Sequence, residues 1–179
     1  MSKFNAIKRI LRLYPAIIHA LTDLAFKKDI VAATLLLQMK TLKLVGHLFI
    51  ITDIAFIVEP LNQTLQKRDL DFESIEATYR LTCLKLEDLI DQNKTGSLLQ
   101  SFLNDVQPKG IYKKILLRSS KDDIEYLQKR NKDLIALPLQ SLKFRLGEIC
   151  DFIPFKVLNI DKIKKLRPNT PRLYRVWEI

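Results

Sequence analysis

The sequence is poor in the residues that shape turns and in those that bind metals. Its 179 residues include only four glycines and seven prolines, too few for the many tight turns of a β-sandwich or barrel. The glycines are isolated and form no phosphate-binding loop. Two cysteines, Cys83 and Cys150, are too few for a disulfide framework and too isolated for a zinc site. The composition therefore indicates a mostly helical protein with reduced cysteines, for which we expect a nuclear or cytoplasmic location.

What the sequence does have is apolar residues and positive charge. Hydrophobic residues make up 47% of the chain, enough for a core at this length, and they exclude a disordered protein. The net charge of +10 is uneven: residues 1–28 carry +5, residues 29–106 carry −4 and residues 107–179 carry +9. Positive ends are typical of a face for nucleic acid or for an anionic membrane, and equally of a lysine-rich solvated surface. Charge alone leaves these alternatives open.

Two segments resemble targeting or membrane elements without fitting them. The basic N-terminus is similar to a mitochondrial presequence, but its helical pattern continues without a break into Leu21 and Leu24. The apolar stretch 42–61 has about the length of a membrane span, yet Asp53 would lie near the bilayer centre at a cost of about 2.5–3.5 kcal/mol. We therefore expect a buried helix there and no membrane association.

Apolar residues at helical spacing predict an all-α fold, an irregular bundle of about seven to nine helices with an extended basic C-terminal tail. Pro15 is expected to begin a second helix, and Pro138 to interrupt a late one. Asp29 and Thr41 are predicted N-caps, and the helix around 44–58 is predicted to be the most buried. The expected organisation is a helical domain over 1–155, followed by a short helix and basic tail over 156–179.

Finer expectations concern single residues and short segments. Asp71 and a Ser119 or Ser120 capping box are predicted to begin later helices, and 111–117 is either a loop or a short strand. Inward positions are expected on every helix. In the second and third helices these are Ile17, Ile18, Leu21, Leu24, Val31, Leu35, Leu36 and Met39.

The acidic, histidine and cysteine residues indicate structural roles rather than chemistry. The carboxylate clusters stand at expected helix starts or on solvent faces, where capping and the helix dipole account for them. Asp53 lies inside an apolar helix, so it should pair with a lysine or a helix end; a catalytic acid is the alternative. His19, His47 and Cys83 are expected in or beside the core. We predict no metal site, no cofactor and no enzymatic activity.

Basic residues are the candidate binding site, because phosphate contact requires only positive charge and reach. Tyr112, Tyr174 and Trp177 lie among them and are able to stack on bases. The tentative nucleic-acid-binding residues are Lys109, Lys113, Lys114, Arg118, Lys162, Lys164, Lys165 and Arg167.

The stretch 28–75 reads KDIVAATLLLQMKTLKLVGHLFIITDIAFIVEPLNQTLQKRDLDFESI. It resembles the helical region of hAT-superfamily transposase-like proteins, in particular the domesticated group related to zinc-finger proteins and E3 SUMO ligases. Segments 97–103 and 139–155 resemble later parts less closely, so the resemblance covers about two-thirds of the chain. The positions that match are Asp53, Leu61, Leu65, Gln66, Leu70, Asp71 and Phe72.

The resemblance implies an all-α region that, in these transposases, interrupts a ribonuclease H-like core with three metal-binding acids. No such acid can be assigned to a residue of this chain. The arginine–tryptophan pair of the family is missing, since the sole tryptophan is Trp177. We therefore expect a non-catalytic, truncated helical module derived from a hAT transposase. The alternative is a nucleic-acid-binding protein that uses the basic residues of 107–179. The expected partners are DNA through its phosphates, a protein, or a second copy.

Overall fold

The computed structural model describes residues 3–67, 72–91, 95–106, 110–120 and 122–147. The described part holds six helices and one small β-hairpin, so the all-α prediction is confirmed in its main feature. The elements are α1 (Lys3–Phe26), α2 (Ile30–Met39), α3 (Leu42–Leu65), α4 (Phe72–Asp91), α5 (Ser97–Val106), β1 (Ile111–Tyr112), β2 (Ile115–Leu116) and α6 (Asp123–Leu146).

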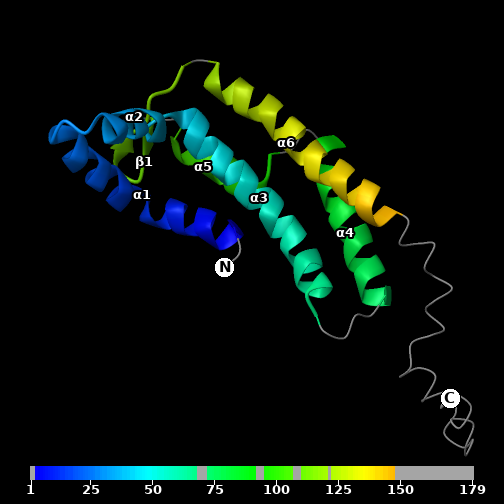
Figure 1. The fold of residues 1–179 in the computed structure, drawn as a ribbon. Coiled ribbons are helices and arrows are strands. Elements are labelled where there is room, and N and C mark those ends of the chain that lie inside the picture. Colours follow the sequence, from blue (N-terminus) through cyan, green and yellow to red (C-terminus); the bar gives the residue numbers. More distant parts are fainter. Residues whose placement is uncertain (1–2, 68–71, 92–94, 107–109, 121, 148–179) are drawn as a thin grey trace, which may run out of the picture.

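Helix α3 is the centre of the molecule, and the other five helices contact it (Figure 1). Thr41 caps its N-terminus by accepting a hydrogen bond from Leu44 N at 3.3 Å, as predicted. By length and composition α3 could cross a membrane, a property that it shares with the core helices of soluble proteins. In this fold its buried side chains fill two cores, one at each half of the helix.

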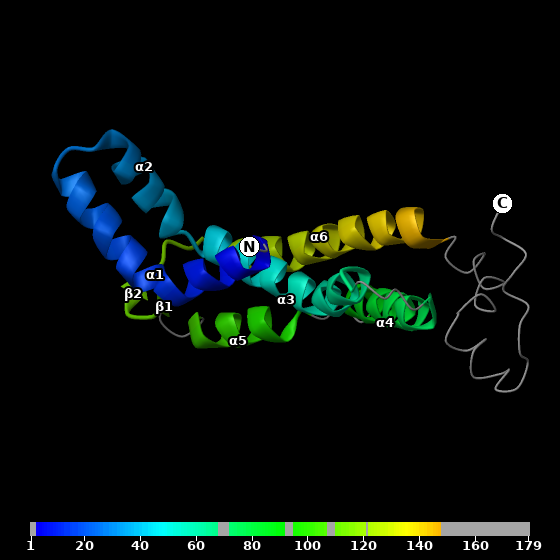
Figure 2. The same ribbon diagram turned by 60° about the horizontal axis from the view of Figure 1, so that its bottom comes forward.

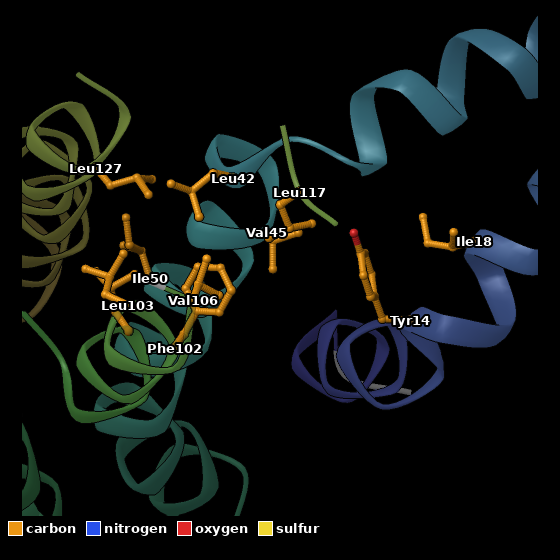
Figure 3. Packing of buried hydrophobic residues seen from close by; sticks show 11 residues of the cluster. Tyr14, Ile18, Leu42, Val45, Ile50, Phe102, Leu103, Val106, Leu117 and Leu127 are labelled. Atoms are coloured by element: carbon orange, nitrogen blue, oxygen red, sulfur yellow. The ribbon is translucent and has the colours of Figure 1, made fainter. Parts of the chain in front are cut away.

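The first core joins α1, α3, α5, α6 and the β-hairpin (Figure 3). Tyr14 is fully buried in it and donates a hydrogen bond from its hydroxyl to the carbonyl oxygen of Met39 at 2.7 Å, which ties α1 to the end of α2. Phe49 of α3 stacks on Phe102 of α5 with ring centroids 4.6 Å apart. Gly46 lets α3 approach α6, since a Cβ there would lie 2.5 Å from Leu127 Cδ1.

The second core is a three-helix contact of α3, α4 and α6. It buries Leu61, Leu86 and Ile135 completely, and an ion pair of 2.6 Å between Lys143 Nζ and Glu87 Oε1 closes its edge. Cys83 lies in this core, as its place on the apolar stripe of α4 predicts.

The predicted helix count of seven to nine is wrong, because Pro15 and Pro138 do not break their helices. Both lie inside single helices, α1 and α6. A proline removes one backbone hydrogen bond and crowds the carbonyl four residues earlier. The buried side chains on either side, such as Tyr14 and Ile18 around Pro15, hold the chain in place across it. Tertiary packing thus overrides the local signal.

The start signals of two helices are confirmed and others fall outside the described part. Asp29 caps α2 by accepting a hydrogen bond from Ala32 N at 3.0 Å. In the segment 111–117, predicted as a loop or a short strand, β1 and β2 form a two-residue antiparallel pair joined by a turn at 113–114. The predicted cap Asp71, Cys150, the domain boundary at 155 and the C-terminal tail lie outside the described residues.

Helices α1 and α2 fold back on each other as a hairpin that projects from one end of the molecule (Figure 2). Its distal end lies away from α4 and the C-terminal part of α6, so the tip has few neighbours within the described chain.

Candidate functional site

Asp53 is the buried acid that the sequence singles out, and it serves as the cap of another helix. Its Oδ1 accepts a hydrogen bond from Leu98 N at 3.1 Å, and its Oδ2 accepts one from Leu99 N at 2.9 Å. These donors are in the first turn of α5, where backbone N–H groups have no partner within the helix. Gly96 leaves room for the carboxyl group, because a Cβ at that position would overlap it.

The contact links α3 to α5 across 45 residues of sequence. Burial raises the pKa of Asp53, and the two N–H donors counteract part of that shift. The sequence offered a lysine or a helix end as the partner, and the structure confirms the helix end. In the described residues no three His, Cys, Asp or Glu side chains come together as a metal site.

Asp123 has an equivalent structural role at the start of α6. It accepts hydrogen bonds from the backbone N–H of Ser120 at 2.9 Å and from the Ser120 hydroxyl, and it pairs with Lys43 Nζ at 3.2 Å. Burial raises the pKa of Asp123, but these bonds outweigh it, and the net pKa is lowered. Half of the predicted capping box is present: the Asp123 carboxylate accepts from the Ser120 N–H, but the Ser120 hydroxyl donates to that carboxylate instead of capping a backbone N–H, and the N-cap position of α6 is Asp122, without a side-chain cap bond.

The two histidines and the described cysteine form no catalytic pair. His19 is exposed, contrary to the expectation of a place in or beside the core. His47 is half-buried against the ring of Tyr126, at 5.8 Å between centroids, and burial lowers its pKa. Burial likewise raises the pKa of the Cys83 thiol, which keeps it protonated and unreactive at neutral pH.

Three of the eight basic residues proposed as nucleic-acid ligands lie in the described part. Lys113 and Lys114 form the turn of the β-hairpin, with φ angles of +46° and +68° that are rare outside glycine. Lys113 is used internally: its ammonium donates to the Leu11 carbonyl oxygen at 2.5 Å and lies 5.4 Å from the centre of the Tyr112 ring. Lys114 and Arg118 are exposed. The other five, Lys109, Lys162, Lys164, Lys165 and Arg167, lie outside the described residues.

Arg118 lies beside a lysine that the sequence reasoning missed. Its backbone N–H donates to the Lys40 carbonyl oxygen at 2.7 Å, and its carbonyl accepts from Leu42 N at 3.0 Å. Lys40 and Arg118 line an open hollow of about 680 Å³, together with Gly110, Leu116, Leu117 and Ser119. None of the described residues that line this hollow is acidic. The two backbone hydrogen bonds of Arg118 form a bridge between Thr41 and Arg118, a long-range pairing that no local sequence signal indicates.

The tip of the α1–α2 hairpin is the second feature that the sequence reasoning missed. The inward positions predicted at Leu24, Val31 and Leu35 are wrong, because these side chains are 44%, 68% and 45% exposed. Helix α2 has apolar residues on all its sides, yet only Ala32 is buried. We call the exposed set the hairpin patch: Leu24, Phe26, Ile30, Val31, Leu35 and Leu37.

A clue to the hairpin patch was present in the sequence. Residues 30–39 read IVAATLLLQM, a helix that is apolar all round and therefore needs cover on every side. Within the described residues α2 packs mainly on α1, with a smaller contact to α3 at its C-terminal end.

Comparisons with family models, with curated proteins and with solved structures found no match to the chain.

Proposed function

We propose that the chain is a non-catalytic helical module derived from a hAT transposase-like protein. The observation that carries this proposal is the use of Asp53. It is the buried acidic residue in the apolar part of the matched stretch, and both of its oxygens accept backbone N–H groups of α5. A carboxylate with both oxygens engaged in this way is poorly placed to bind a metal ion or to move a proton.

Further support comes from the other buried acids of the described part. Asp123 is bonded to Ser120 and Lys43, and Glu76 pairs with Arg80 at 2.7 Å. Each holds a helix start or a helix surface in place. Two-metal phosphoryl chemistry needs acids that converge on one point, whereas these three cap or pair separately.

A cleavage assay tests the proposal. The purified chain, incubated with DNA that carries terminal inverted repeats and with Mg²⁺ or Mn²⁺, is expected to give neither cleavage nor strand transfer. Asp53→Asn and the exposed Asp91→Asn serve as a matched pair. Metal-dependent cutting that is lost in Asp53→Asn and kept in Asp91→Asn would make Asp53 a catalytic acid and overturn the proposal.

A second candidate function, contact with nucleic-acid phosphates, is favoured by the hollow between Lys40 and Arg118. Two cationic side chains and the hydroxyl of Ser119 line an open depression without acidic neighbours in its lining. Phosphate oxygens accept hydrogen bonds from such groups, and binding of this kind is independent of sequence. Exposed Lys114 on the adjacent hairpin turn adds a third positive charge.

The salt dependence of binding tests this second function. Log K against log salt is expected to fall with a slope of about −0.9 for each phosphate neutralised. The triple variant Lys40→Ala, Lys114→Ala and Arg118→Ala should flatten that slope. Lys67→Ala with Lys85→Ala removes charge elsewhere on the surface and should leave it unchanged. Equal effects of both sets, or no binding at low salt, would contradict phosphate binding at the hollow.

A further inference from the structure

The hairpin patch gathers six exposed apolar side chains at one end of two neighbouring helices. Phe26, Ile30 and Val31 at its tip are 91%, 81% and 68% exposed. Scattered single apolar residues are normal on a protein surface, whereas large exposed apolar side chains gathered on two packed helices favour a contact surface. The six residues of the hairpin patch lie within a span of 14 positions, on two helices packed against each other.

The exposed set is comparable in size to a protein–protein contact. Its exposed fractions correspond to a surface on the order of 700 Å², against the ~800 Å² that each partner buries in an interface of standard size, but it is spread over more than one side of α2, so a partner has to contact more than one side of the hairpin to cover it. Helix α2 has further surface to cover, because apolar residues occupy its other sides as well. The opposite half of a four-helix contact would provide that cover, since two helical hairpins packed together bury the sides that one hairpin leaves open.

The charges around the tip favour a protein over a lipid surface. Lys27 and Lys28 stand in the turn, while Asp23 and Asp29 stand beside them. The tip therefore carries two positive and two negative groups, and Asp29 is held at the surface as the cap of α2. Inserting the tip into a bilayer would desolvate these charges, and at the tip the repulsion of the two carboxylates by an anionic headgroup layer offsets the attraction of the two lysines.

A second copy of the chain would match both the exposed apolar side chains and the mixed charges of the tip. Around a two-fold axis each hairpin meets an identical hairpin, so apolar side chains meet apolar side chains. The mixed charges at the rim are self-complementary, because the lysines of one copy are able to face the aspartates of the other. We propose that the chain self-associates through the hairpin patch, with α1 and α2 of two copies forming a four-helix contact.

Sedimentation equilibrium of the full chain over the micromolar range tests the proposal. The wild type is expected to form a dimer. Val31→Lys with Leu35→Lys places two charges in the patch and should raise the dimer dissociation constant at least tenfold. The control, Leu84→Lys with Phe144→Lys, places two charges at residues that are 62% and 89% exposed on α4 and α6, and it should leave the constant unchanged.

Hydrogen exchange supplies a second readout that does not depend on the variants folding. Amides of residues 24–37 in the wild type are expected to become more protected as the protein concentration rises, while those of α4 do not change. A wild type that stays monomeric, or a dimer that persists in the hairpin variant, would overturn the proposal. So would a monomer that binds vesicles of anionic and zwitterionic lipid through the hairpin, since the occupant would then be a membrane.

Discussion

At the scale of single residues, the two buried aspartates show how one side chain type is used under opposite electrostatic conditions. Asp53 is short of charge partners, so burial dominates and its pKa is raised. Asp123 has Ser120 and Lys43 beside it, so hydrogen bonds dominate and its pKa is lowered. Ionisation of Asp53 therefore costs stability as the pH rises through its folded pKa, whereas ionisation of Asp123 adds stability above its unfolded pKa.

The Asp53 cap makes a specific prediction about stability. Asp53→Asn keeps the shape of the side chain but replaces one acceptor oxygen by an NH₂ group, which faces the N–H of Leu98 or Leu99. We expect the free energy of unfolding to fall by about 1–3 kcal/mol, the usual effect of leaving a buried donor unsatisfied. Urea denaturation measures it. Asp91→Asn at the exposed end of α4 is the control and should change stability by less than about 0.5 kcal/mol; a similar loss in both variants would contradict the capping role.

The contribution of Asp123 to the free energy of unfolding is expected to depend on pH, with a sign that follows from its lowered pKa. Because its folded pKa lies below its ordinary value, its stabilising effect is present above the unfolded pKa and is lost as the pH falls through the folded pKa. The difference in unfolding free energy between the wild type and Asp123→Asn should therefore shrink on acidification below about pH 4. Denaturant titrations at several pH values measure this difference. A difference that stays constant or grows as the pH falls would exclude the ion pair with Lys43 as its source.

At the scale of elements, α3 determines the fold because it contributes to both cores. Its buried positions recur at helical spacing along one half of the circumference, from Leu42 and Val45 at one end through Asp53 to Leu61 at the other. The remaining side is apolar as well but only partly covered, as at Ile51 and Phe56. The side chains of Ile50 and Ile51 point in different directions, and only Ile50 is fully buried.

This neighbouring pair provides a matched test of the central position of α3. Ile50→Ala should lower the free energy of unfolding by about 2–5 kcal/mol, because it removes buried surface and leaves a cavity. Ile51→Ala, at a side chain that is 39% exposed, should cost clearly less, about 1 kcal/mol. Thermal and urea denaturation give both values. Equal losses would mean that the two sides of α3 are covered to the same degree, contrary to the packing described here.

The sequence predicted where helices occur better than where they are interrupted or which of their sides are covered. Local signals were sufficient for the caps at Asp29 and Thr41, because a capping side chain bonds within its own first turn. They failed at Pro15 and Pro138, where contacts from distant helices hold the chain straight through a residue that disfavours the helix. They also failed at Val31 and Leu35, because periodicity indicates an apolar side but does not say whether another element is there to cover it.

For the candidate sites, too, local features could be predicted from the sequence and long-range contacts could not. A helix end as the partner of Asp53 could be predicted in kind, since a buried carboxylate needs donors, but Leu98 and Leu99 could not be named without the fold. Lys40 was missed because its nearness to Arg118 depends on a bridge between segments some 78 positions apart. Long-range pairings of this type leave no periodic signal.

At the scale of the whole molecule, α3 joins two cores, and the α1–α2 hairpin extends beyond the first of them. The acids of the described interior stabilise helix starts and surfaces, and the exposed apolar residues of the hairpin patch lie at the opposite end from the three-helix contact of α3, α4 and α6 (Figure 2). Buried acids bond helix starts and surfaces around two apolar cores, and the two surfaces for which we propose contacts, the hairpin patch and the basic hollow, lie outside those cores.

The structural role of Asp53 can be tested most directly by adding Mn²⁺ to the ¹⁵N-labelled protein and following the backbone amide signals of Leu98 and Leu99. Mn²⁺ broadens the signals of nuclei close to its binding site. If both oxygens of Asp53 are bonded to these amides, the two signals should stay sharp and unshifted at a several-fold excess of the metal. Selective broadening of Leu98 and Leu99, absent in Asp53→Asn, would show that the carboxylate binds a divalent cation and would contradict the non-catalytic module proposed here.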